Sequence, residues 1–192
     1  MRVVLASASP RRRALLSGIL PQFEVEPSRF EEVSAGLSAY ETARRNAVGK
    51  ARDVAARHKD AAVIGSDTVV SLGGDILGKP KDAADAKRML RLLSGRTHTV
   101  YTGVCLIAGE EHTEVAAADV TFERLSDETI DAYVASGKPL DKAGAYGIQD
   151  GYPLVRSYKG SFSCIMGLPV GLLEEMLRAA GVLQSSTEEI SC

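Results

Sequence analysis

AAVIGSDTVVSLGGDILG, residues 61–78, has the pattern of a buried strand followed by a hairpin. Its apolar residues form a nearly continuous run, and a glycine pair then predicts a tight turn into a short returning strand. The polar triplet Ser66-Asp67-Thr68 interrupts the run. Because burying an unpaired charge is costly, Asp67 must be paired, bound to a metal or placed at an accessible end of the strand. Such a carboxylate can hold a divalent cation or activate a water for attack on phosphorus; a loop or capping role is the alternative.

Helix and strand signals interleave on both sides of this stretch. Ser38 and Glu41 form an S-x-x-E capping box that opens a long helix, and Asp82 can cap another helix that Gly95 ends. The expected helices are 10–20, 39–57, 83–94, 127–135 and 168–180. The expected strands are 2–7, 23–27, the hairpin within 61–78, 97–109, 111–125, 152–158 and 161–166.

This order of elements predicts the fold class. Helices alternate with strands, but several strand pairs are hairpins, so we predict an α/β fold with a mixed sheet flanked by helices. One domain is expected over residues 1–183, and the polar tail 184–192 is expected to be disordered. Residues 140–151, LDKAGAYGIQDG, have too many glycines for a regular element and too many specific side chains for a linker. They are predicted to form a functional loop.

The composition limits the class of protein. A hydrophobic share of 45% supplies a sizeable core and excludes a disordered or fibrous protein. The formal net charge of -2 argues against a nucleic-acid or membrane-surface binder, which usually carries a net basic patch. Three scattered cysteines suggest neither a disulfide framework nor a zinc site, and no apolar run approaches ~20 residues. We therefore expect a cytoplasmic protein without a membrane anchor.

Three consecutive arginines, Arg11 to Arg13, stand where the first helix should begin, in LASASPRRRALL. The N-terminus of a helix carries a partial positive charge, so cations there are unfavourable. A polyanion bound by the guanidinium groups and the helix N–H groups would reverse this balance, which makes a nucleoside triphosphate a natural ligand. The alternative is that the three side chains extend into solvent.

Other charged residues are candidates with ordinary alternatives. Glu31 and Glu32 are adjacent carboxylates of the kind that Mg²⁺ or Mn²⁺ favours, although they also suit a solvated acidic turn. Lys50 and Lys79 can neutralise phosphate charge, but a lysine is more often on the surface. His98 lies in an alternating strand pattern and is expected to be structural or at the surface. The sequence contains no P-loop, G-x-G-x-x-G or G-x-S-x-G motif.

Seven ordered motifs together resemble the Maf family of nucleoside triphosphate pyrophosphatases. They are LASASPRR, EE, GSDT, ILGKP, LSGRTHTVYTGV, DKAGAYGIQ and MGLP, and the likeness runs in register from residue 2 to residue 180. The resemblance implies a fold related to the inosine triphosphate pyrophosphatases, with an elongated, bent sheet around a deep central cleft, and often a homodimer. It also implies hydrolysis of a nucleoside triphosphate to a monophosphate and pyrophosphate, with Mg²⁺, Mn²⁺ or Co²⁺ required.

The resemblance also implies roles for individual residues. The implied catalytic residues are Asp67, Glu32 and Lys79, of which Asp67 is the proton acceptor, and Asp67 and Glu32 are also the metal ligands. The implied substrate-binding residues are Ser7, Arg11, Arg12, Lys50, Thr68 and Gln149. Among them, Arg11, Thr68 and Gln149 match positions associated with substrate choice. Arg13 has no such match and is expected to be exposed.

The motifs also indicate a branch of the family. SPRR, GSDT and AGAYGIQ resemble the dTTP/UTP pyrophosphatases, whereas the branch acting on 7-methyl-GTP departs from this pattern. The amide of Gln149 can pair with the imide edge of uracil or thymine, so dTTP, UTP and modified pyrimidine nucleotides are the expected substrates. The alternatives are a preference for 7-methyl-GTP and a non-catalytic, nucleotide-binding regulator of septum formation. Nucleic-acid binding is not expected, because the overall charge is near neutral.

Overall fold

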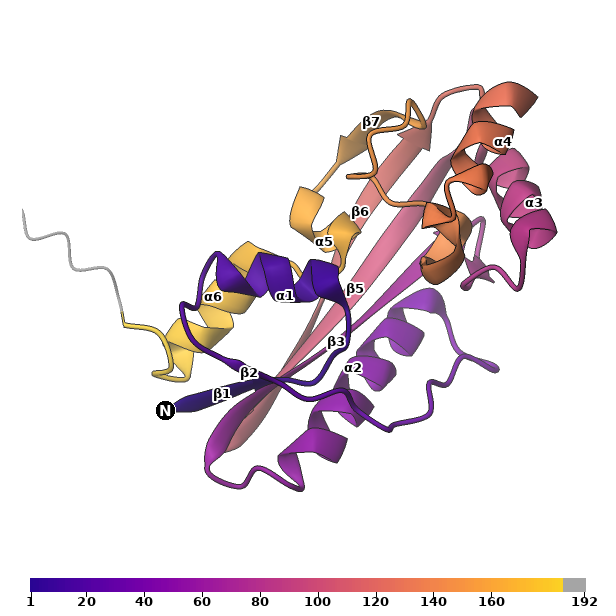
Figure 1. Ribbon diagram of the computed structural model, residues 1–192. Helices are drawn as coiled ribbons and strands as arrows, with labels where there is room; N and C mark the ends of the chain where they lie inside the picture. The colour runs from indigo at the N-terminus through magenta and orange to yellow at the C-terminus, as the bar shows by residue number, and fades with distance from the viewer. Residues whose placement is uncertain (185–192) are drawn as a thin grey trace, which may run out of the picture.

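A computed structural model describes residues 1–184, which form a mixed sheet of seven strands with helices on both faces (Figure 1). The strands are β1 (Arg2–Leu5), β2 (Glu24–Val25), β3 (Ala61–Leu72), β4 (Asp75–Leu77), β5 (Thr97–Ala108), β6 (Glu110–Phe122) and β7 (Val155–Lys159). Their order is β2-β1-β3-β5-β6-β7, and β4 pairs with β3. β1 is parallel to β2 and β3, and the other pairs are antiparallel. The predicted mixed α/β fold is confirmed.

The helices cover the two faces of this sheet. They are α1 (Pro10–Ser17), α2 (Ala39–Ala55), α3 (Ala83–Leu93), α4 (Asp127–Ala135), α5 (Phe162–Met166) and α6 (Val170–Ala179), with the 3₁₀ turns η1 (Lys138–Asp141) and η2 (Ala143–Ala145). Helix α2 lies on one face, and α1 and α6 lie on the opposite face (Figure 1). None of these helices, within the described residues, is both long and apolar enough to cross a membrane.

The C-terminal end of the described chain differs from the prediction in one segment. The strand predicted for residues 161–166 is wrong, because this segment forms α5. The hydroxyl of Ser161 accepts the N–H of Cys164 and caps the helix, and Gly167 ends it with a left-handed φ of 114°. These local hydrogen bonds outweigh the strand preference of SFSCIM. The predicted disordered tail, apart from residue 184, lies outside the described residues.

Helix α2 lies unusually close to the sheet, because two strand positions have no side chain. A Cβ atom at Gly65 of β3 would lie 2.3 Å from the carbonyl oxygen of Ala47, and one at Gly103 of β5 would lie 2.4 Å from that of Ala43. Real Cβ atoms are not found at such distances, so glycine is required at both positions. This close contact brings the polar side chains of α2 directly to β3.

The edge of β3 that faces β1 is only partly paired. β1 pairs with residues 61–64, and β4 pairs with residues 70–72 of the same strand. Within the described part of the chain, no strand pairs with residues 65–69 on this edge. The polar triplet of the sequence therefore lies beside a gap in the sheet. Asp67 and Thr68, which point to opposite faces of the strand, both border this gap, and Ser66 is fully buried.

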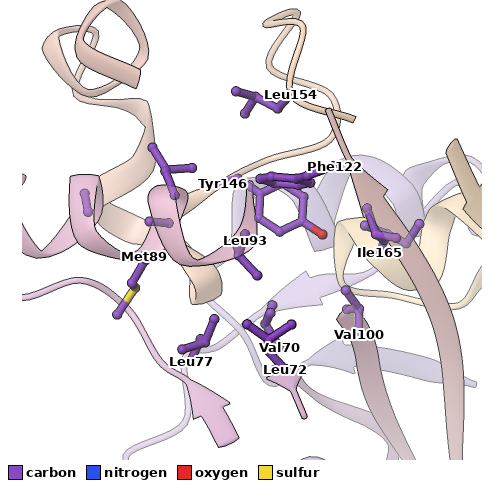
Figure 2. Close-up of a cluster of buried hydrophobic side chains, with 14 of the residues drawn as sticks. Val70, Leu72, Leu77, Met89, Leu93, Val100, Phe122, Tyr146, Leu154 and Ile165 are labelled. Carbon is purple, nitrogen blue, oxygen red and sulfur yellow. The ribbon is translucent and has the colours of Figure 1, made fainter. Parts of the chain in front are cut away.

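A cluster of buried apolar side chains packs next to this gap, with members from β3, β5, β6, α3 and α4 (Figure 2). The ring of Tyr146 packs edge to face against Phe122, with ring centroids 4.8 Å apart. His98 is buried, as a structural residue would be, and its Nε2 lies 2.8 Å from the Tyr146 hydroxyl. Burial lowers the pKa of His98 to about 4, so its ring is neutral at physiological pH.

Candidate active site

The gap beside β3 opens into a cleft of about 600 Å³. Its wall includes the start of α1, the segment before α2, one face of α2, β3, β4 and the 3₁₀ turns. The structure brings together all nine residues that the sequence proposes for the site: Ser7, Arg11, Arg12, Glu32, Lys50, Asp67, Thr68, Lys79 and Gln149. The floor is formed partly by the apolar cluster, since Val70, Val100, Tyr146 and Ile165 also line the cleft.

Asp67 lies at the centre of a buried polar cluster on the α2 face of the sheet. Its Oδ1 accepts a hydrogen bond from Nζ of Lys50 at 2.7 Å, and its Oδ2 accepts one from Nδ2 of Asn46 at 3.0 Å. The same lysine donates to Oε1 of Glu32 at 2.6 Å. The side chains of Asp67 and Lys50 are 8% and 11% exposed, whereas that of Glu32 is 54% exposed. Asp67 is therefore paired, as the sequence requires of a carboxylate in an apolar strand.

The charge state of Glu32 follows from this cluster. Partial burial raises the pKa of Glu32, but the hydrogen bond and charge of Lys50, together with the charges of Lys79 and Arg12, outweigh it. The pKa of Glu32 is therefore below its ordinary value, and Glu32 is ionised at neutral pH. Lys50 lies between two carboxylates, which leaves the cluster with a local negative excess.

Arg12 shows why an arginine occupies the first turn of α1. Its Nε donates to the carbonyl oxygen of Gly167 at 2.8 Å, and its two Nη atoms donate to the hydroxyls of Ser7 and Thr68, each at 3.2 Å. The guanidinium thus joins the segment after β1, strand β3 and the turn after α5. Burial lowers the pKa of Arg12, while the charges of Asp67 and Glu32 oppose this effect. The unfavourable charge at the helix start is offset by fixed acceptors as well as by nearby carboxylates.

The other two arginines of the run have different surroundings. Nη1 of Arg11 lies 3.2 Å from Oδ2 of Asp141, across the mouth of the cleft, and the Arg11 side chain is 25% exposed. Arg13 is exposed and does not line the cleft, as predicted. Lys79 is exposed on the cleft wall, and within residues 1–184 its ammonium has no hydrogen-bond partner. Arg11 and Lys79 are therefore the cations most accessible to an anion.

The loop predicted to be functional forms the wall opposite α2. Nζ of Lys142 donates to Oδ1 of Asp141 at 2.9 Å and lies 3.5 Å from Oδ2 of Asp150. The phenol of Tyr133 donates to Asp150 at 2.6 Å and accepts the N–H of Gly147 at 2.9 Å. These bonds hold a segment that has little regular structure of its own.

Asn46 was missed at the level of sequence, and Asp141, Lys142 and Tyr146 were predicted only as part of the functional loop 140–151, not as individual site residues. For Asn46 a signal was present. Thr42, Asn46 and Lys50 recur every four residues on the same face of α2 as a row of buried alanines, and polar residues on such a face indicate a buried polar site. The carboxylate partners of Lys142 could not be predicted. Asp141 and Asp150 reach it through irregular turns, which have no helical or strand periodicity from which a contact can be inferred.

The carboxylates of the cleft fit a divalent cation of the Mg²⁺ type. Asp67 and Glu32 both direct an oxygen at the ammonium of Lys50, so the two carboxylates converge on one small region. Within residues 1–184, no group of three or more His, Cys, Asp or Glu side chains could hold a metal. Mg²⁺ is commonly bound by one or two carboxylates together with waters and phosphate oxygens, which agrees with this donor set.

Comparisons with known proteins agree with the fold and the motifs. The family model described as Maf-like protein matches residues 2–180. Proteins named dTTP/UTP pyrophosphatase from Moorella thermoacetica and Deinococcus radiodurans are 49% and 48% identical to this chain; the alignments cover 94% of the chain in both cases, and 96% and 94% of the relatives. The solved Staphylococcus aureus Ham1 protein shares the fold with a TM-score of 0.53 and 18% identity, over 93% of this chain and 99% of the other.

Proposed function

The chain belongs to the Maf family, and we propose that it is a nucleoside triphosphate pyrophosphatase that hydrolyses dTTP and UTP to the monophosphate and pyrophosphate. The names of its relatives and the residues of the cleft support this proposal. The observation that carries it is the Asp67 cluster, a buried and ionisable group in a cleft that also contains cations for phosphate. Such an arrangement suits attack of water on phosphorus.

In the proposed reaction, Asp67 accepts a proton from the attacking water. Lys50 and Asn46 each occupy one carboxylate oxygen, yet each oxygen retains a second lone pair for the proton. The two donors fix the direction of the carboxylate, since Asn46 is itself held by the N–H of Val33, which its Oδ1 accepts at 2.9 Å. A base held in this way is oriented before the substrate arrives.

The phosphates are proposed to bind between the start of α1 and β4. Arg11 and Lys79 supply accessible cations, and the hydroxyl of Ser7 lies beside the guanidinium of Arg12. These groups are placed to neutralise the charge that develops on the pyrophosphate leaving group. The cleft is therefore more positive at this end than at the Asp67 cluster.

A divalent metal is proposed to bind with the substrate, with Asp67 and Glu32 as its protein ligands. It would neutralise phosphate charge and increase the acidity of a bound water. Release of pyrophosphate should then require Mg²⁺, Mn²⁺ or Co²⁺ and stop when EDTA is added. Unchanged turnover in excess EDTA would contradict the metal proposal and leave the assignment of Asp67 intact.

Pyrophosphate release with dTTP, UTP, CTP and 7-methyl-GTP tests the proposed function directly. We expect turnover of dTTP and UTP, and release of pyrophosphate rather than orthophosphate. A protein that binds dTTP without releasing product would instead be the nucleotide-binding regulator. A clear preference for 7-methyl-GTP would place the substrate outside the pyrimidines.

A further inference from the structure

The hydroxyl of Thr68 belongs to a directed chain of hydrogen bonds. Thr102, on the neighbouring strand β5, donates its single proton to the carbonyl oxygen of Cys164 at 2.8 Å. Its oxygen lies 3.0 Å from that of Thr68, so Thr68 must be the donor in that contact. Thr68 also accepts from Nη2 of Arg12 at 3.2 Å, because a guanidinium can only donate. The proton of Thr68 is therefore already used, and only an acceptor lone pair is left for a ligand in the cleft.

The amide of Gln149 is directed by a second chain on the opposite wall. The N–H of Gly147 donates to the phenol oxygen of Tyr133, and the phenol donates to Oδ2 of Asp150. The other carboxylate oxygen, Oδ1, accepts from Nε2 of Gln149 at 3.1 Å. A carboxylate cannot donate, so the nitrogen end of the amide stays at Asp150. The carbonyl oxygen of Gln149 is therefore turned away from Asp150 and is left as an acceptor for a ligand, while the amide nitrogen keeps one further N–H.

Ser7 shows the opposite polarity in the same cleft. Its oxygen accepts from Nη1 of Arg12 and from the N–H of Ser9, each at 3.2 Å. Both acceptor positions are therefore occupied, and its proton is free to be donated to an anion. The cleft thus has a donating hydroxyl beside the proposed phosphate site, and accepting groups at Thr68 and Gln149.

We propose that Thr102 and Asp150 are positioning residues that fix Thr68 and Gln149 as hydrogen-bond acceptors, so that the cleft selects a base with a ring N–H. This inference rests on the proposed function and extends it to residues beyond the implied site. Uracil and thymine have an N–H at position 3, whereas the N3 of cytosine is an acceptor and would face an acceptor. Thr102 and Asp150, which do not touch the base themselves, thus set the preference for UTP over CTP through Thr68 and Gln149.

Asp150→Asn reverses the polarity of Gln149 with almost no change in shape. Tyr133 still donates, and Lys142 is near the same oxygen, so the new amide keeps its oxygen toward them. Its nitrogen then faces Gln149, whose amide must rotate to accept and present its own NH₂ group to the ligand. We expect the ratio of kcat/KM for UTP to that for CTP to fall about tenfold.

Thr102→Val tests the first chain, and Thr102→Ser is its matched control. Valine has the shape of threonine but cannot accept, so the Thr68 proton becomes free to be donated to the base. Cys164 keeps one partner, because the N–H of Gly167 also donates to its carbonyl oxygen at 3.0 Å. The ratio of kcat/KM for UTP to that for CTP should fall in Thr102→Val and stay at the wild-type value in Thr102→Ser.

These ratios separate positioning from a merely structural role. A loss of turnover that is equal for UTP and CTP in both variants would overturn the proposal, and so would a wild-type preference for CTP. If a variant does not fold, wild-type protein with 3-methyl-UTP, which lacks the N–H, tests the requirement for a ring N–H: a rate equal to that with UTP overturns the proposal. If no nucleotide is hydrolysed, the proposed function fails, and the affinities for UMP and CMP still test the polarity.

Discussion

The two walls of the cleft each hold a buried lysine between carboxylates. On the α2 wall, Lys50 is 11% exposed and contacts Asp67 and Glu32. On the opposite wall, Lys142 is 9% exposed and contacts Asp141 and Asp150. The residue types and distances are similar, so charge alone does not distinguish the two groups.

The difference lies in what carries each group. Lys50 and Asp67 come from a helix and a strand that are held in close contact by glycines, whereas Lys142 lies between two short 3₁₀ turns, next to Gly144 and Ala145 with left-handed φ values of 67° and 59°. Rigid elements suit a base that must not move, and an irregular loop suits recognition. We therefore expect variants of the first group to affect turnover and variants of the second to affect the loop and the choice of base.

The largest expected effect is the loss of turnover in Asp67→Asn. Without the proton acceptor, kcat should fall by about 10²–10⁴-fold, while circular dichroism still shows a folded protein. The variant should also lose some stability, because its new NH₂ group faces the NH₂ group of Asn46. Activity near that of wild type at saturating Mg²⁺ would remove Asp67 from the mechanism.

The double variant Asn46→Asp/Asp67→Asn is the matched control. It exchanges the two side chains, so it restores one donor and one acceptor at this contact and keeps the charge of the cluster. The new carboxylate on α2 would accept from the new amide on β3 and from the N–H of Val33, as Asn46 Oδ1 does in the wild type. Melting temperature should recover, but turnover should not, because the carboxylate is in the wrong place.

The Asp67 wall was the more predictable from sequence. The run of apolar residues in β3 made Asp67 conspicuous, and the motifs brought Glu32 and Lys50 to the same site. Asn46 was missed, although its spacing from Lys50 indicated it. The loop wall was less predictable, because its contacts depend on where each turn ends. The wrong strand at residues 161–166 has a similar cause, since a serine cap and a glycine determine α5 locally.

Of the two buried lysines, Lys50 on the α2 wall should contribute more to stability than Lys142. Lys50→Met leaves Asp67 buried with only Asn46 as a partner, so the free energy of unfolding should fall by about 3–5 kcal/mol. Lys87→Met is the control, since Lys87 and Asp131 are also 2.7 Å apart but are 35% and 55% exposed. That surface pair should contribute about 0–1 kcal/mol. Equal losses in urea unfolding would show that burial does not distinguish the two pairs.

Lys142→Met should cost less than Lys50→Met. Asp150 keeps the hydrogen bonds from Tyr133 and Gln149, and Asp141 is 62% exposed and can be solvated. We expect a loss of about 1–3 kcal/mol in the free energy of unfolding, with faster amide exchange confined to residues 138–150. A loss as large as that of Lys50→Met would mean that the loop is as rigidly held as the helix.

Arg11→Ala should affect the substrate more than the fold. Its ion pair with the exposed Asp141 is at the surface, so the melting temperature should hardly change. Loss of a cation that faces the triphosphate should lower kcat/KM for dTTP by about tenfold, mainly through KM. A large drop in melting temperature with unchanged KM would instead make Arg11 a structural residue.

The smallest expected effect is on stability at low pH, where variants of the two walls should behave alike. Burial raises the pKa values of Glu32 and Asp141, but Lys50 and Lys142 respectively outweigh it, so both pKa values are below the ordinary ones. A depressed pKa contributes stability above the pKa of the unfolded chain, about 4.3 for Glu and 3.9 for Asp, and this is lost as pH falls through the folded value. Glu32→Gln and Asp141→Asn should therefore each be less stable than wild type at pH 7, by a margin that shrinks towards pH 3. If the margin stays constant, these carboxylates contribute to stability through shape and not through charge.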